Sequence, residues 1–359
     1  MKISDETILD IDLNKLERNY NYLKSLIKSN TKIIAVVKAF AYGHGDIEIS
    51  KKLEKIGVYA LWVSDIKEAI KLRKAEIRCK IIVANPGYRS YDEIIKYNLD
   101  VIVYNQKLLL LYCTKKSPIN IHLKFNTGMN RYGFDEKEIN IIAKKIIENK
   151  QLNLLSICSH LASSENINKK EFTISQLEKF EKINCDFKKL YNKEFNSHIL
   201  NSNGVLNYPE YQFNMVRLGI GLYGSANNKN LKQISKLTSI IVQIRIIKKG
   251  EYIGYGSCFI AQRKMQIAIV PVGYADGLNR KLSNNNGVVI VKKLKCKILG
   301  AISMDSLAID ISNLDINEGD KVEIFGENLS VLEIANKINT IPYEIYSTLN
   351  KRIKRVYWN

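Results

Sequence analysis

Two parts of the sequence carry groups whose chemistry is complementary: a lysine amine and loops suited to bind an anion. Lys38 directly follows the short apolar run 33–37. Much later, Ser202 and the backbone amides near Gly219 and Ile220 lie in loops of small residues. A lysine amine forms a Schiff base with an aldehyde, and hydroxyl and amide donors bind a phosphate ester. Together these groups indicate a site for pyridoxal phosphate, if the fold brings them together.

The elements that must position these groups are short apolar runs that alternate with helical patterns. Apolar residues at spacings of three and four predict amphipathic helices over 13–27 and 177–190. Short buried strands separated by helices are typical of right-handed βαβ units and a parallel sheet. The apolar runs are 33–37, 59–63, 80–84, 100–104, 119–124, 153–159, 196–200 and 213–217.

Eight such runs predict an α/β fold, an N-terminal (β/α)8 barrel with outer helices. A doubly wound open sheet stays the alternative, because the number of strands does not exclude it. No Gly-x-Gly-x-x-Gly pattern follows the first run, which disfavours a dinucleotide site. Barrel enzymes carry their chemistry at the carboxyl ends of the strands, so this fold places several polar groups on one rim. These groups are Lys38, Lys124, His160, Ser202 and Arg217.

The pattern changes after about residue 230, where short β-like runs and turns dominate. Runs such as 266–272, 287–291, 307–311 and 321–325, together with a longer run at 240–247, indicate strands, and a helix is expected near 330–338. We therefore predict a barrel domain over residues 1–230 and a mostly β domain over residues 231–359.

Composition indicates a soluble globular enzyme. The net charge is +19, but the basic residues are scattered and lack the interleaved aromatics of a nucleic-acid groove, so nucleic acid is not an expected partner. No two of the six cysteines form a Cys-x-x-Cys pair, and no metal site is expected. The polar start, residues 1–6, and the absence of a long apolar run predict a cytoplasmic protein without a membrane partner.

The sequence resembles the alanine racemase family over nearly its whole length, with the motifs in family order. The stretch 35–45, AVVKAFAYGHG, is similar to the family's pyridoxal-lysine motif. The resemblance implies a barrel followed by a β domain, pyridoxal 5'-phosphate as cofactor, and a homodimer with shared active sites. The other matching stretches are 124–133, 159–162, 198–202, 217–224, 271–280, 303–305 and 341–344.

The resemblance implies a set of cofactor-binding residues. Lys38 would hold the cofactor and act as one of two acid/bases at the substrate Cα. Arg217 would face the pyridine nitrogen, keep it unprotonated and so restrict side reactions, and His198 would orient Arg217. The remaining cofactor-binding residues would be Tyr42, His160, Ser202, Gly219, Ile220 and Tyr343.

The resemblance also implies residues that act on the substrate. Tyr274 would be the second base, supplied by the partner subunit on the opposite face of Cα, because racemisation removes a proton from one face and returns it on the other. Arg131 would reach the substrate carboxylate, and Met304 and Asp305 would line the carboxylate pocket from the partner subunit.

Two positions depart from the usual pattern of the family. Lys124 matches a lysine that is often carbamylated and then orients the arginine that matches Arg131. Asn126 stands where the family commonly has aspartate, which removes a negative charge near Lys124. Phe40 stands where asparagine is common, beside Lys38.

The function that this resemblance implies is the interconversion of L- and D-alanine, which supplies D-alanine for peptidoglycan. A serine or broad-specificity amino-acid racemase stays an alternative, because loops set the size of the pocket. A pyridoxal phosphate decarboxylase of related fold is disfavoured, since Arg217 stands where such an enzyme usually has an acidic residue. A non-catalytic pyridoxal phosphate carrier is disfavoured by the β domain.

Overall fold

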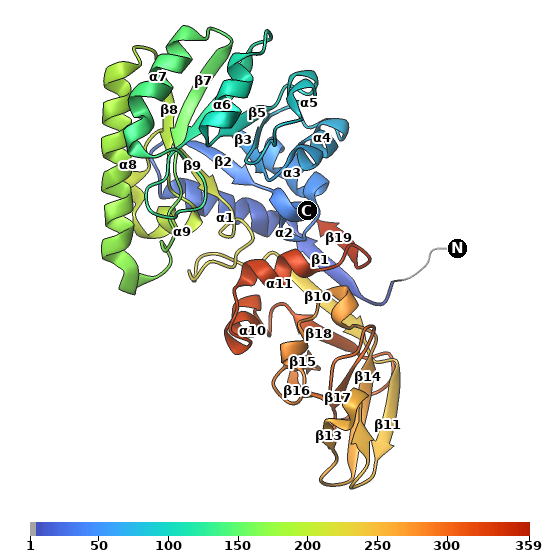
Figure 1. Ribbon diagram of the computed structural model, residues 1–359. Coiled ribbons are helices and arrows are strands. Elements are labelled where there is room, and N and C mark those ends of the chain that lie inside the picture. Colours follow the sequence, from blue (N-terminus) through green and yellow to red (C-terminus); the bar gives the residue numbers. More distant parts are fainter. Residues whose placement is uncertain (1–4) are drawn as a thin grey trace. The chain divides into compact units, whose positions relative to one another are not determined.

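The computed structural model describes residues 5–359, and the chain divides into two compact units (Figure 1). The barrel unit comprises Glu17–Ala41 and Asp46–Leu222. The β unit comprises residues 5–16, Tyr42–Gly45 and Tyr223–Asn359. Residues 1–4, where the polar N-terminal run begins, lie outside the described residues.

The barrel unit contains eight parallel strands in the order β8-β7-β6-β5-β4-β3-β2-β9. Its two end strands approach each other, because the Asn214 N–H donates to the Ser197 carbonyl at 3.2 Å and the Arg217 N–H to the Leu200 carbonyl at 2.9 Å. The nearly closed (β/α)8 barrel predicted from the sequence is therefore confirmed. The strands are β2 (Lys32–Val36), β3 (Ala60–Val63), β4 (Lys80–Val83), β5 (Asp100–Val103), β6 (Ile119–Lys124), β7 (Leu152–Cys158), β8 (Asn196–His198) and β9 (Met215–Leu218).

Amphipathic helices follow the strands of the barrel. In α8 the residues Leu177, Phe180, Ile183 and Phe187 are fully buried, as their helical spacing predicts. Figure 1 shows α7 and α8 packed together outside β7 and β8. The helices are α1 (Leu13–Ser25), α3 (Asp46–Lys55), α4 (Ile66–Lys74), α5 (Tyr91–Lys96), α6 (Gln106–Cys113), α7 (Ile139–Glu148), α8 (Lys170–Leu190) and α9 (Ser202–Asn207).

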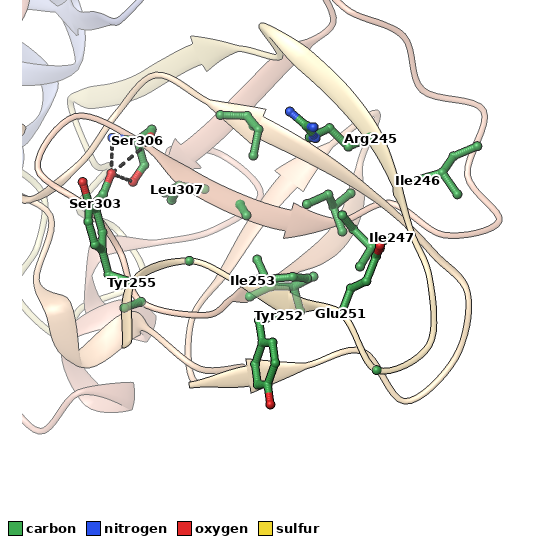
Figure 2. A pocket seen from close by; sticks show the side chains of 17 residues that line it. Arg245, Ile246, Ile247, Glu251, Tyr252, Ile253, Tyr255, Ser303, Ser306 and Leu307 are labelled. Atoms are coloured by element: carbon green, nitrogen blue, oxygen red, sulfur yellow. Dashed lines mark hydrogen bonds between the residues drawn. The ribbon is translucent and has the colours of Figure 1, made fainter. Parts of the chain in front are cut away.

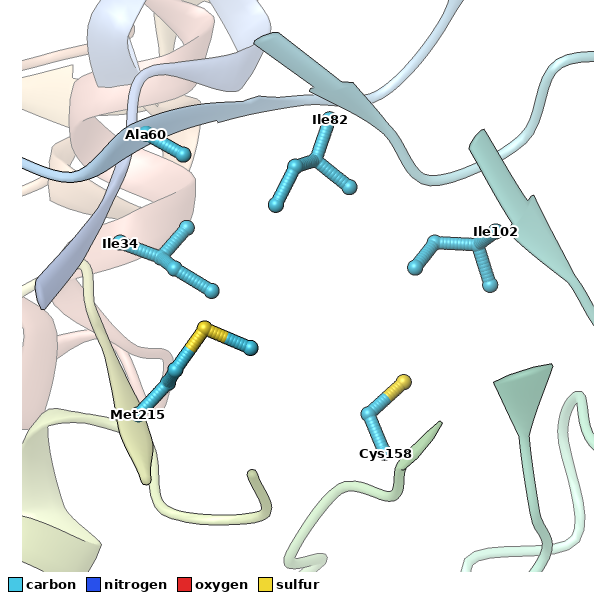
Figure 3. Packing of buried hydrophobic residues seen from close by; sticks show 6 residues of the cluster. All are labelled: Ile34, Ala60, Ile82, Ile102, Cys158 and Met215. Carbon is cyan, nitrogen blue, oxygen red and sulfur yellow. The ribbon is translucent and has the colours of Figure 1, made fainter. Parts of the chain in front are cut away.

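Apolar side chains from six of the strands meet inside the barrel (Figure 3). Successive residues of a strand point to opposite faces, so every second residue of each strand belongs to this interior. The same alternation fixes which polar residues of the strands also face inward. The apolar members of the interior cluster are Ile34, Ala60, Ile82, Ile102, Cys158 and Met215.

The β unit is built on a nine-stranded sheet in the order β11-β14-β17-β16-β15-β18-β10-β1-β19, beside a small hairpin, β12–β13. The strands are β1 (Ile8–Asp12), β10 (Ser235–Ile240), β11 (Gln243–Ile247), β12 (Tyr252–Ile253), β13 (Phe259–Ile260), β14 (Met265–Val270), β15 (Val288–Val291), β16 (Leu294–Leu299), β17 (Leu307–Asp310), β18 (Lys321–Phe325) and β19 (Lys354–Trp358). The helices are α10 (Val331–Lys337), which lies where a helix was predicted, and α11 (Pro342–Thr348).

The division of the chain differs from the predicted boundary at residue 230, because the β unit resumes at Tyr223 and also includes residues 5–16 and Tyr42–Gly45. Strand β1 pairs with β10 and β19 rather than with a barrel strand. Only alternate residues of β1 are buried, whereas the barrel strands are buried almost throughout, so β1 fits a sheet with one buried face. The run 240–247 is also not one strand, because it divides between β10 and β11.

Among residues 5–359, no helix combines the length and the apolar character that crossing a bilayer would require.

The barrel interior makes a prediction about stability. Replacing Ile102, which is 1% exposed, with alanine opens a cavity and should lower the free energy of unfolding by about 2–5 kcal/mol. Replacing Ile167, which is 78% exposed, removes the same atoms and should change it by less than about 0.5 kcal/mol. Denaturant titration of both variants measures the difference, and equal losses would contradict the assignment of Ile102 to the core.

Candidate active site

Cationic side chains gather at the carboxyl ends of the barrel strands. Lys38 follows β2, Lys124 ends β6, and Arg217 lies in β9. Burial lowers the pKa of Lys124 to about 8; among the neighbouring groups, Cys158 has the largest effect and raises it, while the charges of Arg217, Arg131 and Lys38 each lower it. This coupling means that the four cationic residues lie close to one another, so the barrel unites the groups that the sequence placed on one rim.

Lys38 is held in an environment that favours its neutral amine. Burial lowers its pKa, and the charge of Arg131 lowers it too, while Glu68 opposes both. The neutral amine is the form that attacks an aldehyde. The environment of Lys38 therefore supports the role predicted from the sequence, which stays a prediction.

The backbone after Lys38 forms a left-handed helical turn. Ala39, Phe40, Ala41 and Tyr42 have φ values of 53°, 57°, 51° and 51°. This conformation costs about 1–2 kcal/mol per residue for non-glycine residues. Neither Phe40 nor the small Ala39 removes this cost, so surrounding contacts must hold the turn.

Glu68 of helix α4 is one such contact, and the sequence analysis missed it. Its Oε1 accepts from the Ala39 N–H at 2.6 Å and its Oε2 from the Ser64 N–H at 2.7 Å. The carboxylate thereby ties the residue after Lys38 to the end of β3. No local motif marks this role, because Glu68 reads in the sequence as an ordinary exposed residue of a helix.

Arg217 is almost fully buried, at 4% exposure, and among residues 5–359 no carboxylate forms an ion pair with it. It donates to the carbonyls of Ser159 at 2.6 Å and Ile199 at 3.0 Å, and its guanidinium lies 5.4 Å from the centre of the Trp62 ring. Burial lowers its pKa to about 10. Arg217 is thus a cation in a fixed position, and it cannot give up a proton at neutral pH.

Two neutral histidines complete the surroundings of Arg217. Its guanidinium donates to Nδ1 of His198 and, at 3.1 Å, to Nδ1 of His160. Burial and the charge of Arg217 hold the pKa of both imidazoles well below its usual range. Both rings therefore accept from Arg217 rather than repel it, and the orienting contact predicted for His198 is present.

The loop after β6 carries Arg131 and is fixed by Asn126. The Asn126 Oδ1 accepts from the N–H groups of Gly128 at 3.1 Å and Asn130 at 3.0 Å. Lys124 Nζ lies 5.6 Å from the centre of the Tyr132 ring, which follows Arg131. Asn126 serves as a turn residue here, and an uncharged amide is sufficient for that role.

Ser202 and the loop after β9 form the expected small-residue cup. The Ser202 Oγ accepts from the N–H groups of Gly219 at 2.8 Å and Gly221 at 3.1 Å. A Cβ on Gly221 would lie 3.0 Å from Leu23 Cδ1 and 3.1 Å from Ser202 Cβ, so glycine permits this close approach. Ile220 is 1% exposed. Hydroxyl and amide donors thus converge in one place.

Two further residues predicted to bind the cofactor lie in the β unit. The rings of Tyr42 and Tyr343 have centres 5.6 Å apart, and Tyr42 also lies 4.8 Å from Tyr223. Burial, followed by the effect of Tyr343, raises the pKa of Tyr42 above its usual range. The Tyr42 phenol therefore stays protonated and can donate a hydrogen bond.

The three predicted substrate residues of the β unit form one cluster. The N–H of Tyr274 donates to the Ser303 carbonyl at 3.0 Å, next to Met304. Asp305 accepts from Arg352 at 2.8 Å. Tyr274 is 42% exposed and Met304 53% exposed. Tyr274, Met304 and Asp305 are thus brought together on a surface of the β unit.

A second tyrosine, Tyr255, lies in a cavity of the β unit and was missed by the sequence analysis. The cavity has a volume of about 1040 Å³ and is lined by Tyr255, Ser303 and Arg245, among others (Figure 2). The Tyr255 ring is 76% exposed, and the flanking Gly254 and Gly256 have φ values of 77° and 70°. The Gly-Tyr-Gly pattern was the available signal, because such a turn presents its central side chain to solvent.

Two family models match this chain, and they divide it between them. The model described as alanine racemase, N-terminal domain, matches residues 11–227, and the model described as alanine racemase, C-terminal domain, matches residues 234–357. A curated alanine racemase of Halothermothrix orenii is 34% identical, with 100% of this chain and 98% of that protein covered. Alanine racemase 1 of Clostridium acetobutylicum is 37% identical, with 97% of this chain and 94% of that protein covered.

Solved structures agree with these sequence matches. Alanine racemase of Clostridium difficile has a TM-score of 0.91 and 32% identity, with 99% of this chain and 97% of that chain covered. Alanine racemase of Bartonella henselae, with covalently bound pyridoxal phosphate, has a TM-score of 0.90 and 30% identity, with 99% of this chain and 100% of that chain covered. Alanine racemase of Bacillus anthracis with bound L-Ala-P has a TM-score of 0.92 and 26% identity, with 100% and 96% covered.

The lowered pKa of Lys124 has a measurable consequence. Because that pKa is about 8, half of the Lys124 amines should be neutral and nucleophilic near pH 8. Competitive labelling with a trace of acetic anhydride at a series of pH values, read by mass spectrometry, should show a midpoint near pH 8 for Lys124. Denatured protein supplies the control, in which the midpoint should move up towards 10.5, and an unchanged midpoint would contradict the proposed burial effect.

Proposed function

The chain belongs to the alanine racemase family, and from this premise we propose that it interconverts L- and D-alanine with pyridoxal phosphate as its cofactor. The proposal rests chiefly on Lys38, a lysine of lowered pKa at the end of a barrel strand, within the motif that resembles the family's pyridoxal-lysine motif. Both domains of the family are matched, and in order, over nearly the whole chain.

The residues present fit the cofactor. Lys38 offers an amine, and Ser202, Gly219 and Ile220 offer a hydroxyl and amides for a phosphate, joined in this proposal by Tyr42 and Tyr343. Bound pyridoxal phosphate supplies an electron sink for the negative charge that remains at the substrate Cα when its proton leaves.

In this proposal, Arg217 determines which reactions of the substrate are favoured. Arg217 would donate a hydrogen bond to the ring nitrogen of the bound cofactor and would transfer no proton to it, because its pKa is about 10. An unprotonated ring nitrogen would make the cofactor a weaker electron sink than an acidic partner would, which would favour return of a proton to the substrate Cα over other reactions. His160 and His198, both neutral, accept from Arg217 and hold its plane.

Arg131, with Met304 and Asp305, is proposed to hold the substrate carboxylate. Lys124 is proposed to become carbamylated: its neutral amine adds to carbon dioxide, a C–N bond forms, and one proton is released. The lowered pKa of Lys124 supplies the neutral amine, and the surrounding cations stabilise the resulting anion. Asn126 does not hinder this, since its side chain is engaged in the loop.

Two bases are needed, one on each face of Cα, and Lys38 is the first. The sequence favours Tyr274 as the second base. The structure adds a second candidate, Tyr255, because it lines the cavity of the β unit, which Tyr274 does not. In either case a phenol whose ordinary pKa is about 10 requires nearby positive charge to act near neutral pH.

We further propose a cytoplasmic homodimer in which the β unit of one chain completes the barrel site of the other, supplying D-alanine for peptidoglycan. The division of the candidate residues between the two units supports shared sites. A serine or broad-specificity racemase stays the second candidate, and chiral analysis with L-serine beside L-alanine distinguishes the two.

Lys38 can be tested by chemical trapping. Borohydride treatment of the cofactor-loaded protein should attach pyridoxal phosphate irreversibly to Lys38 alone, because it is the lysine that carries the aldehyde. Peptide mapping by mass spectrometry locates the label. Attachment at Lys124 or at any other lysine would refute the assignment, and Lys38→Ala should take up no label and should not racemise alanine.

The two tyrosines can be separated by mixing variants. Each Tyr→Phe variant alone should lose activity if its phenol is the base, by about 10²–10⁴-fold in kcat. Dimers mixed from Lys38→Ala and Tyr255→Phe chains, or from Lys38→Ala and Tyr274→Phe chains, then contain one site with both bases if the sites are shared. The Tyr→Phe variant that is inactive alone identifies the tyrosine, and restored activity in its mixed dimers shows that the partner chain supplies it. If mixed dimers form and neither pairing restores activity, the shared site is refuted.

A further inference from the structure

A continuous row of polar side chains crosses the barrel interior behind Arg217. Arg217 contacts His198 Nδ1, the His198 Nε2 lies 3.1 Å from the Ser156 Oγ, and the Ser156 Oγ lies 2.6 Å from Nδ1 of His122. The His122 Nε2 in turn lies 3.8 Å from the Asp100 Oδ2. We call these five residues the interior relay.

The interior relay follows from strand register. Asp100, His122, Ser156, His198 and Arg217 come from β5, β6, β7, β8 and β9. His122 is paired with Ile102, and His198 with Cys158, both members of the interior apolar cluster. Asp100, Ser156 and Arg217 each lie two residues before or after a member of that cluster, so all five face inward. Each is at most 4% exposed.

Arg217 determines which atom of each residue in this row carries the proton. A guanidinium only donates, so the Nδ1 of His198 accepts and a neutral His198 carries its proton on Nε2. That N–H donates to the Ser156 Oγ, which leaves the Ser156 hydroxyl to donate to Nδ1 of His122. The proton of a neutral His122 then lies on Nε2 and points towards the Asp100 Oδ2.

Two buried polar atoms without a hydrogen-bond partner lie at the far end of the row. Only four buried side-chain atoms among residues 5–359 lack a hydrogen-bond partner, and the His122 Nε2 and the Asp100 Oδ2 are two of them. The other oxygen of Asp100 accepts from Asn120 at 2.7 Å. Buried polar atoms without partners are rare and need a physical reason. Here the His122 Nε2–H is a donor that faces the Asp100 Oδ2, an acceptor. The Asp100 carboxylate is therefore positioned to accept from the last imidazole of the row.

We propose that Ser156, His122 and Asp100 are positioning residues, which fix the proton order of the interior relay and thereby hold His198 and Arg217 in register with the cofactor ring. This proposal rests on the proposed function of Arg217. The carboxylate of Asp100 places negative charge at one end of the row, whereas Arg217 has a buried positive charge at the other. None of the three residues touches the cofactor, so their effect must pass through His198.

The proton order can be read directly by nitrogen NMR of the cofactor-loaded protein. The chain has only 4 histidines, so 15N-labelled imidazoles can be assigned with single His→Gln variants. We expect Nε2 of both His122 and His198 to carry a proton and Nδ1 of both rings to accept a hydrogen bond. A proton on Nδ1 of either ring, or on both nitrogens, would overturn the proposal. This readout does not depend on racemase activity, so it separates the relay from the proposed function.

The functional part is tested with Ser156→Ala and a matched control. Ser197 is also fully buried, and its hydroxyl donates to Asn184 at 2.6 Å, outside the interior relay. Ser197→Ala therefore removes an equally buried hydroxyl. We expect Ser156→Ala to lower kcat about 5–10-fold at unchanged KM for alanine and to remove the downfield Nε2–H resonance of His198. We expect Ser197→Ala to leave kcat and the His198 resonance unchanged, although it should lower Tm by a similar amount.

Equal kcat values for the two alanine variants, or persistence of the His198 resonance in Ser156→Ala, would refute the role of Ser156. Absence of racemisation in the unmodified protein would instead refute the proposed function, while the NMR result would still decide the proton order.

Discussion

The burial of the Arg217 guanidinium among neutral acceptors is the interaction on which the rest of the barrel site depends. A cation buried without an adjacent carboxylate lowers the pKa of every base near it, because a second positive charge would be repelled. Burial is the larger cause of the lowered pKa of Lys124, His160 and His198, and the charge of Arg217 lowers all three further. The buried charge of Arg217 thus favours the neutral form of the bases around it. Carbonyls and imidazoles accept its hydrogen bonds in place of an ion pair.

The pKa of Lys38 is also lowered mainly by burial, but the neighbouring cation that adds to the effect is Arg131. The position of Lys38 depends on a left-handed turn that ordinary residues adopt only at a cost, and on Glu68, which fastens that turn through the Ala39 N–H. Strained backbone at the start of a site is acceptable where neighbouring contacts hold it in place. The reactive amine and the local strain therefore belong to the same few residues.

The β unit contributes four phenols to the candidate residues. Tyr42 and Tyr343 lie against each other, while Tyr255 and Tyr274 are both exposed on the β unit. A phenol is neutral over the usual pH range, so it can donate hydrogen bonds or, beside cations, act as a base. Within the β unit, the Arg280 guanidinium lies 6.0 Å from the centre of the Tyr274 ring.

The sequence by itself determined the periodic features of this protein. Runs of apolar residues located the eight barrel strands, and the residues at their ends, such as Lys38 and Arg217, marked the reactive rim, because side-chain alternation and strand ends are local properties. The tertiary structure alone decided the rest. Glu68 reaches the turn from a separate helix, β1 joins strands from the far end of the chain, and Asp100, His122 and Ser156 meet only across neighbouring strands. The local sequence pattern predicts which face of the sheet a side chain lies on. Only the register of strand pairing determines which residues it contacts there.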